Sequence, residues 1–401
     1  MDDRNPVMVQ YLLERGADVN LPAGENHGLT ALQAAALAGN HKIMDCLLEA
    51  GADVRAPPAK ERGFTVLEAA ASALMRARSH RGEVEKRVAT FRKLLASGAP
   101  VNRSDGSDNS LLHYLVRASQ MQCLNEALGA GVNTEDYVST VVHHPSAKLT
   151  PLQVAGATHD VKAIRALLDH GANINAPASN NCRTDCPGGR TALQAAVDDI
   201  PYYDGNDEAK ETEETVQLLL QNNANVNAPP SSNFGRTALQ AATSTERPDA
   251  KLVALLLQYG ADVNADPSER GGVTALQGAA ISGDIQIARI LLAHGANVNA
   301  PRAPEDGRTA IEGAAEHGRL DMVRLLLDNG ALPDVNDGFS RAIELAERES
   351  CFQIADILRE RQLVSESSLM GLLDQPGWSS EVHSSDLDMM LFAEDEHAMR
   401  F

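Results

Sequence analysis

Aromatic residues make up only 3% of this 401-residue sequence, and its 35 basic residues are outnumbered by 55 acidic ones. The formal net charge of −20 argues against direct binding to nucleic acid or to an anionic membrane surface, because both depend on Lys and Arg. No apolar run approaches the roughly 18 residues of a transmembrane helix. The opening MDDRNPVMVQ lacks the basic start and apolar core of a signal peptide. Five scattered cysteines form no disulfide framework. These absences predict a soluble, intracellular protein.

Repetition is the feature that the sequence has in abundance. The phrase TALQAA occurs at Thr191–Ala196 and at Thr237–Ala242, and it opens TALQAAA at Thr30–Ala36. It returns as TALQGAA from Thr274, and looser copies begin at Thr65, Thr150 and Thr309. Most of these phrases are followed by an LL pair and then by GA(D/N)VN. Such self-similarity predicts a solenoid, in which each unit buries its apolar face only against its neighbours.

The repeating unit resembles the ankyrin repeat, which begins with T-P-L-H-x-A and ends with L-L…G-A-D-V-N. The resemblance covers about residues 5–362, and the interval from Thr274 to Thr309 is 35 residues. Segments such as NAPPSSNFGRTALQ also resemble the ankyrin arrays of filamentous fungi. The resemblance implies an all-α ankyrin-repeat solenoid of helix–turn–helix units with β-turn fingers between them. It also implies that the chain binds other proteins.

The repeat spacing divides the chain into three parts. Residues 1–29 are interpreted as a partial N-terminal repeat, residues 30–362 as an array of about eight further repeats, and residues 363–401 as a mostly disordered acidic tail. The partial repeat lacks its inner helix, so either its apolar residues tolerate exposure or the chain continues upstream. We expect a monomer. Four insertions are either recognition elements or drift in exposed loops; they lie near residues 77–87, 134–149, 176–190 and 202–214.

Glutamine replaces the histidine of the ankyrin signature in most units. In the unit that begins at Thr274, the threonine can cap a helix, and Leu276 with the following alanines forms a packed inner face. Because glutamine offers both a donor and an acceptor, we predict that it braces the finger and has no catalytic role. The position is occupied by Gln33, Gln153, Gln194, Gln240 and Gln277, by Glu68 and Glu312, and once by His113.

Few residues have a spacing suited to chemistry. Cys182 and Cys186, with His170 nearby in sequence, could hold a metal, form a disulfide or be ordinary loop cysteines, and the spacing misses the usual zinc pattern. The pair His143-His144 could likewise hold a metal or consist of ordinary loop residues. Nothing matches a phosphate-binding glycine loop, a nucleophile elbow or a zinc-hydrolase helix. We therefore predict no enzyme activity, no cofactor and no metal site.

A basic cluster in the first insertion contrasts with the acidic whole. It is either a nuclear-import signal, a patch for an acidic partner, or a solvated helix extension balanced by Glu83 and Glu85. Its members are Arg76, Arg78, Arg81, Lys86, Arg87, Arg92 and Lys93.

The C-terminal tail carries the most specific functional signal. Its segment SSDLDMMLFAEDE, from Ser384 to Glu396, interleaves acids with apolar residues that include Leu387, Leu391 and Phe392. Acids keep such a segment solvated, and its apolar residues can then dock as a short helix in a hydrophobic groove. This resembles acidic transcriptional activation motifs. The alternatives are a solubilising tail or a helix that packs back on the last repeat.

The sequence therefore favours an interaction scaffold that acts as a nuclear transcriptional co-regulator. In this interpretation the array binds a DNA-binding transcription factor and the tail recruits the transcription machinery. The alternative is a cytoplasmic ankyrin adaptor, or the sensing arm of a larger nucleotide-binding immune or signalling protein. Aromatic residues at projecting positions are candidate anchors for a partner; they are Phe64, Tyr202, Tyr203 and Phe234.

Overall fold

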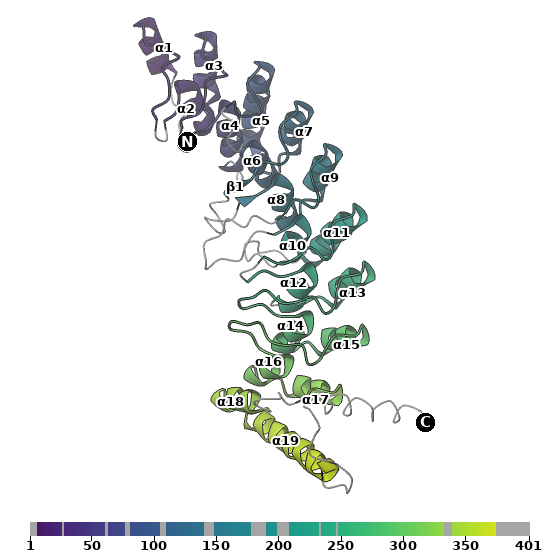
Figure 1. Ribbon diagram of the computed structural model, residues 1–401. Helices are drawn as coiled ribbons and strands as arrows, with labels where there is room; N and C mark the ends of the chain where they lie inside the picture. The colour runs from purple at the N-terminus through teal and green to yellow at the C-terminus, as the bar shows by residue number, and fades with distance from the viewer. Residues whose placement is uncertain are drawn as a thin grey trace.

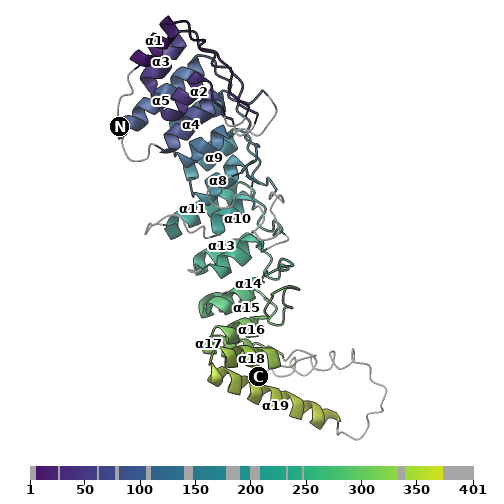
Figure 2. The same ribbon diagram turned by 90° about the vertical axis from the view of Figure 1, so that its left-hand side faces the viewer.

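The helices of the protein stack side by side into an elongated, curved solenoid (Figure 1). The N-terminal helix α1 (Val7–Glu14) lies at one end and α19 (Phe352–Leu373) at the other (Figures 1 and 2). The computed structural model describes residues 6–25, 28–60, 63–76, 81–104, 110–139, 148–177, 190–198, 208–231, 234–245, 248–332 and 339–373.

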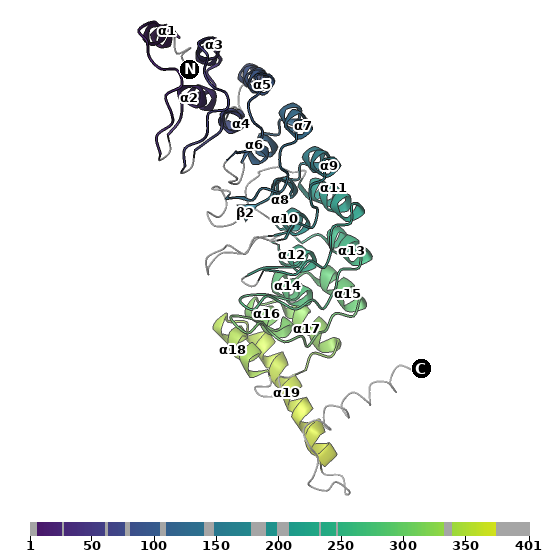
Figure 3. The ribbon, with the colours of Figure 1, turned by 45° about the horizontal axis from the view of Figure 1, so that its top comes forward.

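The helices form two layers, and the fingers project from the inner layer on the inside of the curve (Figures 1 and 3). The inner layer consists of α2 (Ala31–Ala38), α4 (Val66–Arg76), α6 (Leu111–Arg117), α8 (Pro151–Ala157), α10 (Ala192–Val197), α12 (Ala238–Ser244), α14 (Ala275–Ser282), α16 (Ala310–Glu316) and α18 (Ser340–Arg348). The outer layer consists of α1, α3 (His41–Glu49), α5 (Arg81–Ala96), α7 (Met121–Gly129), α9 (Val161–Asp169), α11 (Glu208–Gln221), α13 (Ala250–Gln258), α15 (Ile285–Ala293), α17 (Leu320–Asp328) and α19.

The array contains one helix pair more than the repeated phrase predicted. Nine inner–outer pairs follow α1 in the described part of the chain, whereas the motif spacing indicated about eight units. The last pair, α18–α19, begins inside the predicted bounds of the array, and its inner helix starts at Ser340 without the TALQ phrase. Helix α19 also continues to Leu373, past the predicted end of the array at Gln362. Residues 374–401 lie outside the described residues.

Two of the four predicted loop insertions are partly helical. Residues 81–87 form the first turns of α5, which has 16 residues where α7 has 9. Residues 208–214 form the first turns of the 14-residue α11. Both segments are rich in Glu, Lys and Arg, which are good helix formers, so the inserted residues lengthen the outer helix. Residues 77–80 and 199–207 lie outside the described part.

The two long fingers differ in how far the structure describes them. In the first, near residues 134–149, strand β1 (Val138–Ser139) pairs in antiparallel fashion with β2 (Lys148–Leu149). This small ladder is an exception to the otherwise all-α architecture. The second, near residues 176–190, falls mostly outside the described residues.

The predicted threonine caps are confirmed. At Thr274 the hydroxyl accepts a hydrogen bond from the Gln277 amide, and the Gln277 side chain accepts one from the Thr274 amide, which makes a capping box. Gly283 then ends α14 at φ 82°, and Asp284 caps α15. The same capping box starts the inner helices after Thr30, Thr150, Thr191, Thr237 and Thr309.

The core is a continuous stack of leucine and alanine side chains that runs the length of the array. The leucine of the repeated phrase is buried throughout, as Leu193 and Leu276 illustrate. Inner helices lie close enough that a Cβ atom at Gly156 would come within 2.6 Å of the Ala192 carbonyl. Small residues on this face are therefore required for helix-to-helix stacking, which explains the shortage of aromatic residues.

The apolar face of α1 is uncovered, as the half-repeat interpretation anticipated. The side chains of Val7, Met8, Tyr11 and Leu12 are all exposed, and α1 has no buried residue. Among the described helices, none combines the length and apolar character that a membrane crossing requires.

Candidate protein-interaction surface

Glutamine side chains attach five of the described fingers to the inner helix of the preceding unit. The Gln277 amide nitrogen donates to the carbonyls of Ala300 and Pro301, at 3.1 and 3.0 Å, while its oxygen serves the capping box. The predicted bracing role is therefore confirmed, with both ends of the amide in use. The same paired contacts to the following finger are made by Gln33, Gln153, Gln194 and Gln240.

Glu68 performs the same task with the opposite polarity. Its fully buried carboxylate accepts hydrogen bonds from the Thr65 amide and from the amide and hydroxyl of Ser110. Because a carboxylate cannot donate to finger carbonyls, the following finger supplies Arg103, whose Nη2 lies 2.8 Å from Oε2. Arg103 also donates to the carbonyl of Gly63. A buried, fully hydrogen-bonded ion pair thus replaces the amide.

A ladder of asparagine side chains connects the units at the ends of the outer helices. The Asn264 side chain donates to the Gly295 carbonyl at 2.9 Å and accepts from the Asn297 amide at 2.7 Å. This asparagine ends the repeated phrase GA(D/N)VN, whose periodicity alone did not reveal its role. The equivalent pair of bonds is made by Asn20, Asn102, Asn175, Asn227 and Asn299.

Three successive fingers are also joined to one another near their tips. The Phe234 amide donates to the Arg270 carbonyl at 3.1 Å, and the Gly271 amide donates to the Glu305 carbonyl at 2.9 Å. The Glu305 amide in turn donates to the carbonyl of Glu269. An ion pair of 3.3 Å joins the Arg270 and Glu305 side chains. These bonds make the three tips one rigid ridge.

Two carboxylates of the inner helices are each held between two arginines. Asp198, at the end of α10, lies 2.5 Å from Arg190 and 3.9 Å from Arg236. Glu316, at the end of α16, lies 2.8 Å from Arg308 and 2.6 Å from Arg348.

Each carboxylate takes one arginine from its own finger and one from the next unit. The hydrogen bond from Arg308 lowers the pKa of Glu316 below its usual range, and Arg348 acts in the same direction.

Helices α12 and α14 lie between these two arginine clamps and carry uncharged side chains. At the positions equivalent to Asp198 and Glu316 they present half-buried Ser244 and Ile281. The interior of the curve therefore consists of a neutral centre flanked by charged clamps. Such an arrangement suits a protein surface with an apolar middle and polar edges, as interfaces commonly have.

A family model described as ankyrin repeats matches three stretches of the sequence, residues 2–80, 206–302 and 251–337. Together these stretches span more than half of the chain. The chain belongs to the ankyrin-repeat family. Its stacked units, fingers and inner helices form a protein–protein interaction scaffold.

The two predicted aromatic anchors that the structure describes differ in their exposure to solvent. Phe64 is half-buried rather than exposed, and its ring lies 6.1 Å from that of Tyr114 in the next inner helix. Its contact is thus internal to the array. Phe234 is exposed, with 39% of its surface accessible, as the sequence predicted. The remaining predicted anchors lie outside the described residues: Tyr202, Tyr203, Leu387, Leu391 and Phe392.

The backbone of Phe234 is unusual for a bulky residue. Its φ angle is 51°, in the left-handed region where the equivalent tip residues are Gly271 and Asp306. That region costs a residue with a side chain roughly 1–2 kcal/mol. The bond from the Phe234 amide to the Arg270 carbonyl holds this conformation, and the ring lies next to Gly271.

Most described members of the basic cluster contact other parts of the array. Arg92 pairs with Glu126 and Lys93 pairs with Asp45, so α5 is tied to both neighbouring outer helices. Arg87 donates to the Ala73 carbonyl and packs over Gly39. These contacts support the interpretation of this insertion as a helix extension. Arg78 and the side chain of Arg81 lie outside the described part.

The cysteines described by the structure are Cys46, Cys123 and Cys351, and all three are free thiols. Burial raises the pKa of the Cys123 thiol to about 12, so the thiol stays protonated at neutral pH. Cys182, Cys186, His143 and His144 lie outside the described residues. Within the described ranges, no three His, Cys, Asp or Glu side chains gather in a way that could hold a metal ion.

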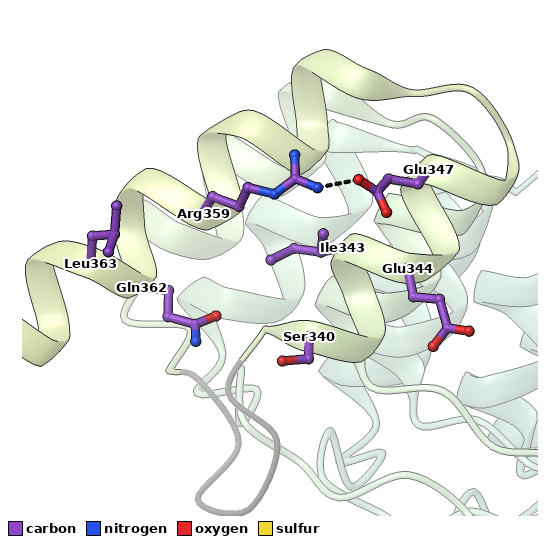
Figure 4. A pocket seen from close by; sticks show the side chains of 7 residues that line it. All are labelled: Ser340, Ile343, Glu344, Glu347, Arg359, Gln362 and Leu363. Carbon is purple, nitrogen blue, oxygen red and sulfur yellow. Dashed lines mark hydrogen bonds and ion pairs between the residues drawn. The ribbon is translucent and has the colours of Figure 1, made fainter.

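An open cavity of about 430 Å³ lies between α18 and α19 at the C-terminal end of the array (Figure 4). Arg359 bonds to Glu347 across it, and Ile343 and Leu363 add apolar surface. Ser340, Glu344 and Gln362 complete the lining. The cavity combines paired opposite charges with apolar surface, so it has no clear chemical preference.

Proposed function

We propose that the protein is a nuclear transcriptional co-regulator. In this proposal the ankyrin array binds a DNA-binding transcription factor, and the tail segment Ser384–Glu396 recruits the transcription machinery. The net charge of −20 supports an indirect route to DNA, because a strongly acidic chain repels the phosphate backbone.

The sequence of the tail segment is the observation that carries this proposal. Acidic residues alternate there with Leu387, Leu391 and Phe392, in the pattern of segments that fold onto a hydrophobic groove when they bind. The segment follows an array that has no such acidic–apolar alternation in its repeated phrases. A rigid binding module joined to a recruiting segment is a suitable arrangement for a co-regulator.

A reporter experiment tests the recruiting half of the proposal. Residues 374–401 fused to a heterologous DNA-binding domain are expected to activate a reporter gene. Replacing Leu387, Leu391 and Phe392 together by alanine is expected to abolish that activation, while replacing Ser384 and Ser385 leaves it unchanged. Activation that persists in the triple variant, or no activation at all, contradicts the proposal.

Affinity purification tests the binding half. The full chain and a version that ends at Val364 are compared in extracts of the native host. The proposal predicts a transcription factor bound to both forms, with components of the transcription machinery lost on truncation. Cytoplasmic partners that bind both forms equally would instead favour a plain ankyrin adaptor.

A further inference from the structure

The three joined finger tips carry an exposed aromatic residue together with exposed acidic residues. We define the fingertip ridge as residues 234–235, 269–272 and 304–307. Backbone hydrogen bonds from Phe234 to Arg270 and from Gly271 to Glu305 hold these tips in register. Because the ridge is already ordered, a partner that binds it pays little for arranging it.

Phe234 supplies the ridge with an apolar anchor. One edge of its ring rests against Gly271, where an added Cβ would come within 2.4 Å of a ring atom. The rest of the ring faces solvent, since 39% of the residue remains accessible. Aromatic side chains, phenylalanine included, are enriched at the buried centres of protein interfaces.

The charges around this anchor are predominantly negative. Glu269, Glu305 and Asp306 are all exposed on the ridge. Arg270 is the basic residue beside them, and its charge is opposed by Glu305 at 3.3 Å.

The arginines that follow the tips point elsewhere. Arg236 lies against Asp198, and Arg308 bonds to Glu316, so both contribute to the clamps on the inner helices. The surface next to Phe234 is therefore acidic within a chain whose net charge is already −20.

We propose that the fingertip ridge binds a basic segment of the partner protein, with Phe234 inserted between its lysine or arginine side chains. An aromatic face attracts such cations, and the flanking carboxylates complement their charge. The inference rests on the proposed function, because it assigns the ridge to the partner that the co-regulator binds. Beyond that function, it specifies where on the array the partner binds and that the bound segment is basic.

Selection from a random library of 16-residue displayed peptides tests the ridge on the full-length chain. Peptides enriched by the wild-type protein are expected to carry net positive charge. The best of them is then titrated by fluorescence anisotropy at 50 and 300 mM NaCl. We expect Phe234→Ala to weaken binding of the peptide by about tenfold or more. We also expect the wild-type protein to bind the peptide more weakly at the higher salt concentration, because the contact is electrostatic.

Matched variants separate the ridge from general effects of exposure and charge. Tyr259 is 40% accessible and ends an outer helix, so Tyr259→Ala removes an aromatic residue of equal exposure from another face. Glu269→Lys reverses a ridge charge, and Asp169→Lys reverses one at the end of α9. The two ridge variants should weaken binding, and the two controls should leave it within about twofold.

Three results would overturn the inference: no enriched peptides, enriched peptides that are neutral or acidic, or binding that Phe234→Ala and Tyr259→Ala affect equally. Circular dichroism of each variant confirms that it is folded. The reporter activity of residues 374–401 does not depend on the ridge, so failure of the peptide selection leaves that half of the proposed function standing. Conversely, a silent tail does not alter the peptide result.

Discussion

Counting α1 as the first unit, the third unit (α4–α5) and the eighth unit (α14–α15) attach their following fingers through the same position of the inner helix. The hydrogen bonds at that position run in opposite directions. In the eighth, Gln277 donates to two carbonyls of the following finger. In the third, Glu68 accepts from Arg103, which the following finger provides. Both side chains also accept from the amide of the threonine three residues earlier. The helix cap is thus constant, and the direction of the finger bond is variable.

The comparison shows that the inner helix and the following finger are matched as a pair. A glutamine requires two free carbonyls in front of it, whereas a glutamate requires a donor. Glu312 also pairs with an arginine at 3.1 Å, but this residue, Arg302, comes from the finger that precedes α16. Exchanging only one member of a pair should therefore destabilise the array more than removing an exposed contact.

The largest effect is expected from Glu68→Ala. The substitution leaves the Arg103 side chain, of which 13% is accessible, without its carboxylate partner, and it removes the acceptor of three further donors. Breaking a buried ion pair in this way costs about 3–5 kcal/mol of unfolding free energy. Urea denaturation followed by circular dichroism measures the loss.

A double variant provides the control for the buried pair. Replacing both Glu68 and Arg103 by methionine removes the charges together, so we expect it to recover at least half of the stability that Glu68→Ala loses. A double variant no more stable than the single one would show that packing, not charge pairing, determines the effect.

The next largest loss of stability is expected when a negative charge is added at the glutamine position. Gln277→Glu directs a buried carboxylate at the carbonyls of Ala300 and Pro301, with no donor available. A buried unsatisfied group of this kind costs about 3 kcal/mol.

The pH dependence of this variant gives a second readout. The unfavourable site raises the pKa of the introduced carboxyl in the folded state, so destabilisation grows as pH rises above about 4.3 and largely disappears below it. Gln277→Met, which removes the same bonds without a charge, should lose less stability at pH 7 and show no such pH dependence. Equal losses for the two variants at pH 7 would argue against the proposed pairing rule.

Much of this architecture follows from the sequence, because the repeated residues act locally. The threonine cap and the glutamine brace each depend on groups at fixed spacing within one unit and its successor. Leu276 and the alanines around it are buried because the helix period places them on one face. The glutamine position was predictable from its donor and acceptor capacity alone.

Contacts between units with unequal spacing were not predictable in the same way. Asp198 meets Arg236 across an insertion, and Phe64 meets Tyr114 across the insertion near residues 77–87. Their registers depend on how the stack twists, which one-dimensional periodicity does not contain. The asparagine ladder differs, since an asparagine equivalent to Asn264 recurs at most unit ends and joins each of them to the next unit through the same two bonds.

Asn264→Ala tests the contribution of that ladder. The substitution removes one bond to the Gly295 carbonyl and one from the Asn297 amide, and both sites are exposed. Because water can replace these partners, we expect a loss of about 1 kcal/mol, well below that of Glu68→Ala. Asn222→Ala is a matched control, because its side chain bonds only to the Leu218 carbonyl of its own helix. Equal effects of the two variants would mean that the ladder does not couple the units.

The smallest loss of stability is expected from Glu316→Gln. This variant tests whether a partly exposed carboxylate stabilises the array as much as the buried carboxylate of Glu68. Arg308 and Arg348 depress the pKa of Glu316 in the folded state, so its stabilisation is present above its ordinary pKa of 4.5 and is lost as pH falls through the lower folded value. An exposed pair of this kind contributes less than about 1 kcal/mol. Urea midpoints at pH 7 and pH 3 should therefore fall slightly less with acidification in the variant than in the wild-type protein. A pH dependence that Glu316→Gln leaves unchanged would assign the acid sensitivity of the array to other carboxylates, and would restrict the rule of paired charges to buried positions such as Glu68.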